Sequence, residues 1–315
     1  MTGHTARIVG AGALVLALGV SLLAANDPRV TFSVGALRRD GIIVPFGAFD
    51  GKRWSNAWPL PALALTIPID VRGIPPRWWG PARPLDVWQA WTGGEARNLR
   101  IVQPDWVNVH CVRQIGLRSD YVAPVAAPPR TEQPYPKDGL AVSPPQPVET
   151  IAVVPADSEE ARALAPMVQG AFNKAERIVE NRDRHPVSRR AREGRPPDIE
   201  AVYALGDHPR IYYIEAARRY RLLGQKEDCE AVGFGTIWFA RDGAQIRELD
   251  SAVDLLACNR RFASYMLPFG AMRAAGRLYW LAQFSGFDHE RYVVIAIKPT
   301  TVEAVLSVWG GSCSR

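Results

Sequence analysis

The sequence predicts a β-rich α+β fold, in which an antiparallel β-sandwich or barrel-like domain precedes a helix-then-meander α+β domain. Three observations predict this class. Short apolar segments bounded by turn residues recur over residues 28–121. A stripe of apolar residues at helical spacing follows between residues 157 and 181. From residue 230 onward, strand-like segments and turn signals return, which is typical of helices followed by a strand meander.

Length, composition and charge limit the classes of protein that remain. The chain has 315 residues, of which 47% are apolar and 22% charged, so a sizeable core is expected. At about 150 residues per domain, this length predicts two domains. The net charge of +6 is mild and is not concentrated in a basic stripe, so we expect no nucleic-acid partner.

The first 25 residues have the three parts of an export signal. Met1–Arg7 is basic, Ile8–Ala25 carries no charge, and Asn26–Pro28 ends the apolar run. Residues 1–25 are therefore expected to be a signal peptide or an uncleaved N-terminal membrane anchor, because the cleavage site is poor and the run approaches membrane-spanning length. A buried core helix is the remaining alternative. We expect an exported protein, periplasmic or extracellular, which is anchored in the inner membrane if the signal is not cleaved.

Residues 28–121 are predicted to form the first domain, a tryptophan-rich β domain. Gly41–Phe49 ends in an Asp-Gly pair and Leu85–Thr92 in a Gly-Gly pair, and both pairs are hairpin signals. Trp106–Ile115 is predicted to be one strand, with Asn108 and His110 on one face and Val107 and Val109 on the other. Within it, His110 is expected to be an inward-facing histidine with satisfied hydrogen bonds rather than a catalytic base.

The rest of the chain divides into a spacer and a second domain. Residues 122–148 hold eight prolines and are predicted to be an extended, exposed linker. Residues 149–315 are predicted to form the α+β domain. Asp157 is expected to cap its first helix, with a glutamate three residues later completing a capping box. Ile211–Leu223 fits another helix, although its first four residues also fit a strand.

Four cysteines predict a disulfide framework. Their number is even and the expected compartment is oxidising, so we expect disulfide bonds, with free buried thiols as the alternative. Of the three pairings we prefer Cys229–Cys258, which closes a strand–turn–strand segment, together with Cys111–Cys313. The chain has no C-x-x-C pair, which disfavours a thioredoxin-like site or a cysteine-based zinc site.

Tryptophans are the leading candidates for ligand binding, because aromatic rings are enriched where proteins bind their partners. Trp78 and Trp79 lie in a segment broken by prolines and glycines, and Trp54 and Trp58 lie four residues apart near a loop. These four residues are the candidate ligand-binding residues. The alternative is that such rings fill the core of the first domain.

The densest group of metal-ligand residue types is Asp288, His289 and Glu290. We treat these three as weak candidates for a metal or acid–base site. A polar hairpin rim is the favoured alternative, because neighbouring residues of a strand point to opposite faces. No familiar catalytic motif occurs, so we assign no catalytic residue and expect no cofactor.

These observations favour an exported cell-envelope or extracellular binding or structural protein over an enzyme. The expected partner is an envelope polymer, a glycan or another exported protein, and the membrane is contacted only through the N-terminal segment. The alternative is a secreted hydrolase whose polar site is assembled from distant segments. Clustered carboxylates and histidines in one cleft would favour the hydrolase, and exposed aromatic rings would favour binding.

Overall fold

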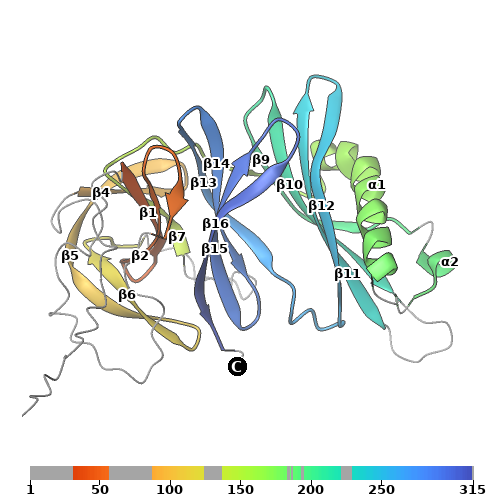
Figure 1. Cartoon of the computed structure of the whole chain (residues 1–315), viewed down its shortest axis with the longest axis horizontal. Coiled ribbons are helices and arrows are strands. Elements are labelled where there is room, and N and C mark those ends of the chain that lie inside the picture. Colours follow the sequence, from red (N-terminus) through yellow and green to blue (C-terminus); the bar gives the residue numbers. More distant parts are fainter. Residues whose placement is uncertain are drawn as a thin grey trace, which may run out of the picture.

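The structure, a computed structural model, describes residues 31–56, 87–123, 137–182, 185, 187–192, 195–220 and 229–313. The predicted export segment, residues 1–25, lies outside these ranges. The predicted fold class is confirmed, since the chain is strand-rich and forms several antiparallel sheets. Figure 1 shows four layers in a row: a barrel, a four-stranded sheet, a five-stranded sheet and a long helix. Within the described ranges, no helix combines the length and apolar character that crossing a bilayer requires.

The first layer is a closed antiparallel barrel with one short extra strand. Its strand order is β1-β7-β4-β5-β6-β2-β3, and β1 also pairs with β2, which closes the ring. Closure leaves the six main strands without a free edge. The strands are β1 Phe32–Arg38, β2 Ile42–Phe49, β3 Trp54–Ser55, β4 Val87–Thr92, β5 Glu95–Val109, β6 Val112–Ser119 and β7 Lys137–Ser143.

Strand β7 departs from the exposed linker that was predicted over residues 122–148. It pairs with β1 and β4, and its central Leu140 is fully buried. The eight prolines of the segment all lie outside Lys137–Ser143, so every residue of β7 keeps the N–H group that a strand ladder needs. The prediction of a wholly extended and exposed segment is therefore wrong for this stretch.

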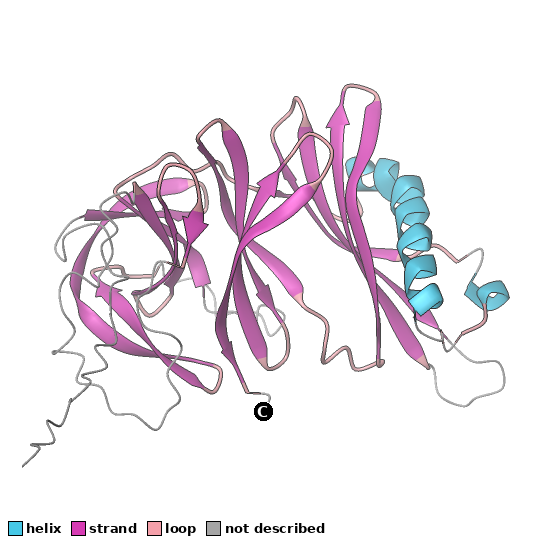
Figure 2. Ribbon diagram, in the orientation of Figure 1, coloured by secondary structure: helices cyan, strands magenta, loops and turns pink. Residues whose placement is uncertain are grey.

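The remaining strands form two antiparallel meanders, visible as separate ribbons in Figure 2. The four-stranded sheet has the order β13-β14-β15-β16, and the five-stranded sheet has the order β12-β11-β10-β9-β8. Their bounds are β8 Ala152–Val153, β9 Asp198–Leu205, β10 Arg210–Tyr220, β11 Ala231–Asp242, β12 Gln245–Leu256, β13 Tyr265–Ala274, β14 Arg277–Ser285, β15 His289–Ile297 and β16 Val302–Ser312.

Helix α1, Glu159–Arg182, covers the outer face of the five-stranded sheet (Figure 1), and a short helix α2, Arg189–Arg192, follows it. The apolar stripe of α1, which includes Phe172, is buried against this sheet. Ser158 caps the helix, because its hydroxyl accepts the N–H of Ala161 at 3.1 Å. The cap is therefore one residue beyond the Asp157 that was predicted.

Strand β10 resolves the ambiguity for residues 211–220, while residues 221–223 lie outside the described ranges. It pairs with β11 along its whole length, so the helix alternative is wrong. Both of its faces are buried: Tyr212 packs in the cluster under α1, while Tyr213 packs in the cluster next to the four-stranded sheet. A strand buried on both faces loses the alternation that distinguishes strands from helices.

A continuous apolar interior joins the layers. Outward-facing barrel residues such as Phe46 pack against the four-stranded sheet, where the Phe46 and Tyr292 ring centroids lie 5.1 Å apart. On the other face of that sheet, Trp280 meets Trp238 of the five-stranded sheet at 5.0 Å. The two halves of the chain therefore share buried clusters across the four-stranded sheet.

Candidate functional site

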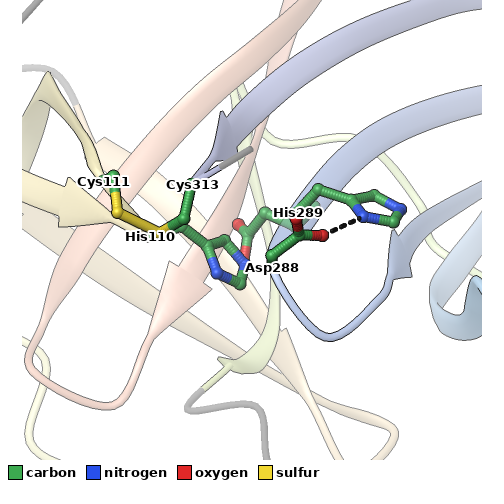
Figure 3. The surroundings of a disulfide bond; sticks show 6 residues. His110, Cys111, Asp288, His289 and Cys313 are labelled. Carbon is green, nitrogen blue, oxygen red and sulfur yellow. Dashed lines mark hydrogen bonds and ion pairs between the residues drawn. A yellow bond between two sulfur atoms is a disulfide. The ribbon is translucent and has the colours of Figure 1, made fainter. Parts of the chain in front are cut away.

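Both predicted disulfides are present. Cys111–Cys313 joins the tip of the β5–β6 hairpin to the residue after β16, with Cα atoms 4.8 Å apart (Figure 3). Cys229–Cys258 joins the residues that flank the β11–β12 hairpin, with Cα atoms 6.0 Å apart. The described residues contain no free cysteine. Two disulfides fit a protein that folds in an oxidising compartment.

An open cleft of about 720 Å³ lies next to both disulfides. This volume is within the range of about 300–1,000 Å³ that is usual for ligand sites. We call it the basic cleft. Its walls come from the barrel, from the four-stranded sheet, and from β10 with the loop that follows β12. The lining residues are Arg38, Asn108, Val109, His110, Arg219, Cys258, Asn259, Arg260, Arg261, Tyr265, Gly286, Phe287 and Glu290.

Two of the four arginines in the basic cleft are held by carboxylates. Arg38 donates to Asp40, with Nη2 at 2.8 Å from Oδ2. Partial burial opposes ionisation of Asp40, yet the Arg38 guanidinium holds the pKa of that carboxyl below its ordinary value. Arg260 Nη1 donates to both carboxylate oxygens of Glu200, at 2.6 and 2.7 Å. These pairs neutralise their own charges and fix the position of each guanidinium.

The other two arginines, Arg219 and Arg261, have no such partner among the residues that the structure describes. Within the described ranges, no carboxylate lies at ion-pair distance from Arg219 or Arg261, and both side chains belong to exposed residues. The guanidinium carbon of Arg261 lies 5.2 Å from the ring centroid of Phe287, in a cation–π contact. The basic cleft therefore carries a local excess of positive charge that its own residues do not neutralise.

Glu290 is the one carboxylate among the lining residues that the structure describes. It is 3% exposed, accepts a hydrogen bond from Gln283 Nε2 at 3.3 Å, and accepts another from the hydroxyl of Tyr292. Burial, followed by the neighbouring Glu290 charge, raises the pKa of Tyr292 well above its ordinary value, so this hydroxyl remains a donor. His110 Nε2 lies 3.8 Å from the Glu290 carboxylate.

His110 corrects the prediction of a single strand over Trp106–Ile115. It has a positive φ of 50° and forms, with Cys111, the turn between β5 and β6. Histidine tolerates this left-handed conformation better than most residues, and no glycine marks the turn in the sequence. The imidazole lines the basic cleft, whereas the prediction was an inward-facing side chain on a strand.

Backbone strain gathers at the same place. The described residues include three non-glycine positions with positive φ, and two of them, His110 and Arg260, line the basic cleft. Such conformations cost free energy and persist where the surrounding structure enforces them, which is common at functional sites. Here each strained residue is within two positions of a disulfide-bonded cysteine, Cys111 or Cys258.

The predicted trio of Asp288, His289 and Glu290 does not converge on one point. His289 Nδ1 lies 3.0 Å from Asp288 Oδ1, and in Figure 3 its ring points away from the disulfide. Glu290 is instead buried beside Tyr292. Among the described residues, no group of three or more His, Cys, Asp or Glu side chains is arranged to hold a metal ion. The geometry therefore places only Glu290 of this trio in the basic cleft.

Of the four tryptophan candidates the structure describes Trp54 alone, and Trp54 does not line the basic cleft. Trp54 is 9% exposed and its ring packs against Phe32, Phe49 and Tyr279. This corrects its assignment as a ligand-binding residue, because the ring belongs to the apolar contact between the barrel and the four-stranded sheet. The predictions for Trp58, Trp78 and Trp79 concern positions outside the described residues.

Sequence reasoning missed two exposed phenylalanines, one of which lines the basic cleft while the other follows a lining residue in the chain. Phe287 lines it and is 72% exposed, while Phe262, directly after Arg261, is 75% exposed. Both lie between strands, where a large apolar side chain has no sheet face to cover. A large apolar residue in a loop was therefore the sequence signal that could have identified these phenylalanines as exposed.

A second polar cluster lies between α1, α2 and β10. Glu176 is buried, with its Oε2 3.2 Å from Arg218 Nη1 and 3.5 Å from Arg192 Nη1. Burial, opposed by the two arginines, raises the pKa of Glu176. These charges compensate one another inside the contact between the helices and the sheet, so we assign this cluster a structural role.

Comparison of the chain with protein-family models, with curated proteins and with solved structures finds no match. The functional assignment therefore depends on the basic cleft itself. Its size, its two arginines without a carboxylate partner among the described residues, its strained backbone and its two neighbouring crosslinks all occur in one region of the fold.

Proposed function

We propose that the protein is an exported binding protein of the cell envelope or the extracellular space, and that its ligand is an anion bound in the basic cleft. The observation that carries the proposal is the pair of exposed arginines, Arg219 and Arg261, that face this cleft without a described carboxylate partner. Guanidinium groups bind carboxylate and phosphate oxygens through charge-assisted hydrogen bonds. The export part of the proposal is supported by the signal-like residues 1–25 and by the two disulfides.

The rigidity of the basic cleft also supports a binding role. Arg38 and Arg260 are fixed by their own carboxylates, and the two disulfides restrain the hairpin tip and the loop after β12. A site held in place before binding loses less conformational entropy when its ligand arrives. Arg219 and Arg261 therefore line a cleft whose neighbouring segments are already held in place by ion pairs and disulfides.

The sequence-based alternative, a secreted hydrolase, has one observation in its favour, the 3.8 Å separation between His110 and Glu290. Glu290 is, however, engaged by Tyr292 and Gln283, and is the one carboxylate among the described lining residues. Glycoside hydrolysis ordinarily uses a pair of carboxylates. The geometry thus favours binding over glycoside hydrolysis by a carboxylate pair.

The double variant Arg219→Ala/Arg261→Ala is expected to bind polyanions at least tenfold more weakly than the parent protein, because it loses two charge-assisted contacts. Titration calorimetry with oligogalacturonate and with polyglutamate at low ionic strength measures this change. The matched control is Arg247→Ala/Arg277→Ala, which removes the same charge from exposed residues. These two residues lie near the N-terminal ends of β12 and β14, whereas the basic cleft lies beyond the C-terminal ends of both strands. Equal losses in both double variants would mean that binding follows net charge alone and would contradict the proposal.

A further inference from the structure

We infer that the ligand of the basic cleft is an acidic glycan, a chain of sugar rings that carries carboxylate or phosphate groups. This inference rests on the proposed function and specifies its ligand. An acidic sugar unit presents three kinds of surface: an anionic group, apolar C–H faces and hydroxyl groups. The basic cleft offers a complement to each of them.

The anionic group is matched by the available arginines. Arg219 is the penultimate residue of β10, and Arg261 lies in the loop after β12. The two guanidinium groups therefore reach the basic cleft from different segments of the chain. Arg38 and Arg260 are paired with Asp40 and Glu200, so they hold the shape of the basic cleft and leave the anion to Arg219 and Arg261. Separate cationic contacts suit a ligand that carries its charges on successive units.

The apolar faces of the sugar rings are matched by aromatic side chains. Phe287 lines the basic cleft with 72% of its surface exposed, and Tyr265 lines it as a half-buried residue. Tyr265 is held edge-on against Phe234, with ring centroids 5.1 Å apart. A charged ligand without rings, such as inorganic phosphate, would make no use of these aromatic surfaces.

The hydroxyl groups are matched by amide side chains. Asn108 and Asn259 both line the basic cleft and are exposed. The Asn259 side-chain oxygen accepts the N–H of Arg261 at 3.2 Å, which orients the amide beside the arginine. An amide supplies both donors and acceptors, which is what the hydroxyl groups of a sugar require.

An acidic peptide is the main competing ligand, and a membrane is the second. A peptide uses a strand edge to satisfy its main-chain groups, whereas seven of the thirteen described lining residues lie in turns and loops. A bilayer surface does not enter a concave site of about 720 Å³. Both ligands are kept as outcomes of the test.

The test is titration calorimetry of the disulfide-bonded protein with four probes. These are oligogalacturonate, a phosphomannan oligosaccharide, a neutral glucose oligomer of the same length, and polyglutamate of the same charge. At least one acidic glycan is expected to bind tenfold or more tightly than both the neutral oligomer and polyglutamate. The first two probes distinguish carboxylate from phosphate as the anionic group. Flotation with vesicles of anionic phospholipid is expected to leave the protein unbound.

The variant Phe287→Ala supplies the specific readout. It is expected to weaken acidic-glycan binding about fivefold, the size of one lost aromatic contact, and to weaken polyglutamate binding by a clearly smaller factor, because polyglutamate loses only the support that Phe287 gives to Arg261. Trp309→Ala removes an exposed ring that does not line the basic cleft and is expected to have no effect. Because Phe287 is largely exposed, its removal is expected to leave the fold intact.

The possible failures can be told apart. Equal binding of polyglutamate, equally sensitive to Arg219→Ala/Arg261→Ala, would overturn the glycan inference and leave the anion site standing. Tighter binding to vesicles than to any oligosaccharide would also overturn it. No binding of any anion would overturn both the inference and the proposed function.

Discussion

Replacement of Cys111 and Cys313 by serine is expected to lower the free energy of unfolding by about 5 kcal/mol, because this disulfide closes a very long loop of the unfolded chain. The two cysteines are 202 residues apart. The loop contains barrel strands β6 and β7, both meanders and helix α1, so its closure restricts the unfolded chain from β6 to the end of β16. Denaturant unfolding of the double variant, monitored by tryptophan fluorescence, measures the loss.

The other disulfide provides the control. Cys229 and Cys258 are 29 residues apart, and the same loop-entropy relation gives about 3.5 kcal/mol for their bond. The variant Cys229→Ser/Cys258→Ser is therefore expected to be the less damaging of the two. Equal losses, or a smaller loss for Cys111→Ser/Cys313→Ser, would show that the long-range crosslink does not constrain the unfolded chain as argued.

The variant Glu215→Gln is expected to be more stable than the parent protein at pH 8 by up to about 3 kcal/mol. Glu215 is a buried carboxyl on β10, where it accepts the Met266 N–H at 2.6 Å and the Tyr213 hydroxyl at 3.1 Å. Burial raises its pKa from 4.5 to about 7, against the effect of these hydrogen bonds. Glutamine keeps the accepting oxygen and removes the buried charge.

The direction of the pH dependence follows from this raised pKa. The folded protein binds the Glu215 proton more tightly than the unfolded chain, so its contribution to stability is full below pH 4.5 and is lost as the pH rises through about 7. Unfolding free energies of parent and variant, measured at pH 5 and pH 8, should diverge at the higher pH. Glu95→Gln, at an exposed position, is the control. A parent–variant difference that does not change with pH would refute the assignment.

The parts of the fold that could be predicted are those set by neighbouring residues. Hairpins at the Asp-Gly and Gly-Gly pairs, the helix after residue 157 and the meander after residue 230 all follow from local turn chemistry and periodicity. The disulfide pairing also followed, because Cys229 and Cys258 flank a hairpin and only one other pair remained. Closure of the barrel by β7 could not be read in this way, since it joins β1 to a strand about 100 residues later.

The residues that line the basic cleft could not be grouped into one site from the sequence. Its lining comes from six separated parts of the chain, so no spacing pattern joins Arg219 to Phe287. An arginine at the end of a strand looks the same in the sequence whether it meets solvent or a cleft. Trp54 was assigned to binding because aromatic residues serve both cores and sites, and only its burial distinguishes the two roles.

Hydrogen–deuterium exchange, with and without oligogalacturonate, tests most directly whether the basic cleft is where the anion binds. Binding in the basic cleft should slow exchange in three segments that form its walls: residues 108–112, 257–263 and 286–288. Exchange in helix α1 should stay unchanged. Slower exchange confined to α1 or to the β11–β12 turn, in a sample that calorimetry shows to be saturated, would place the ligand elsewhere and contradict the account.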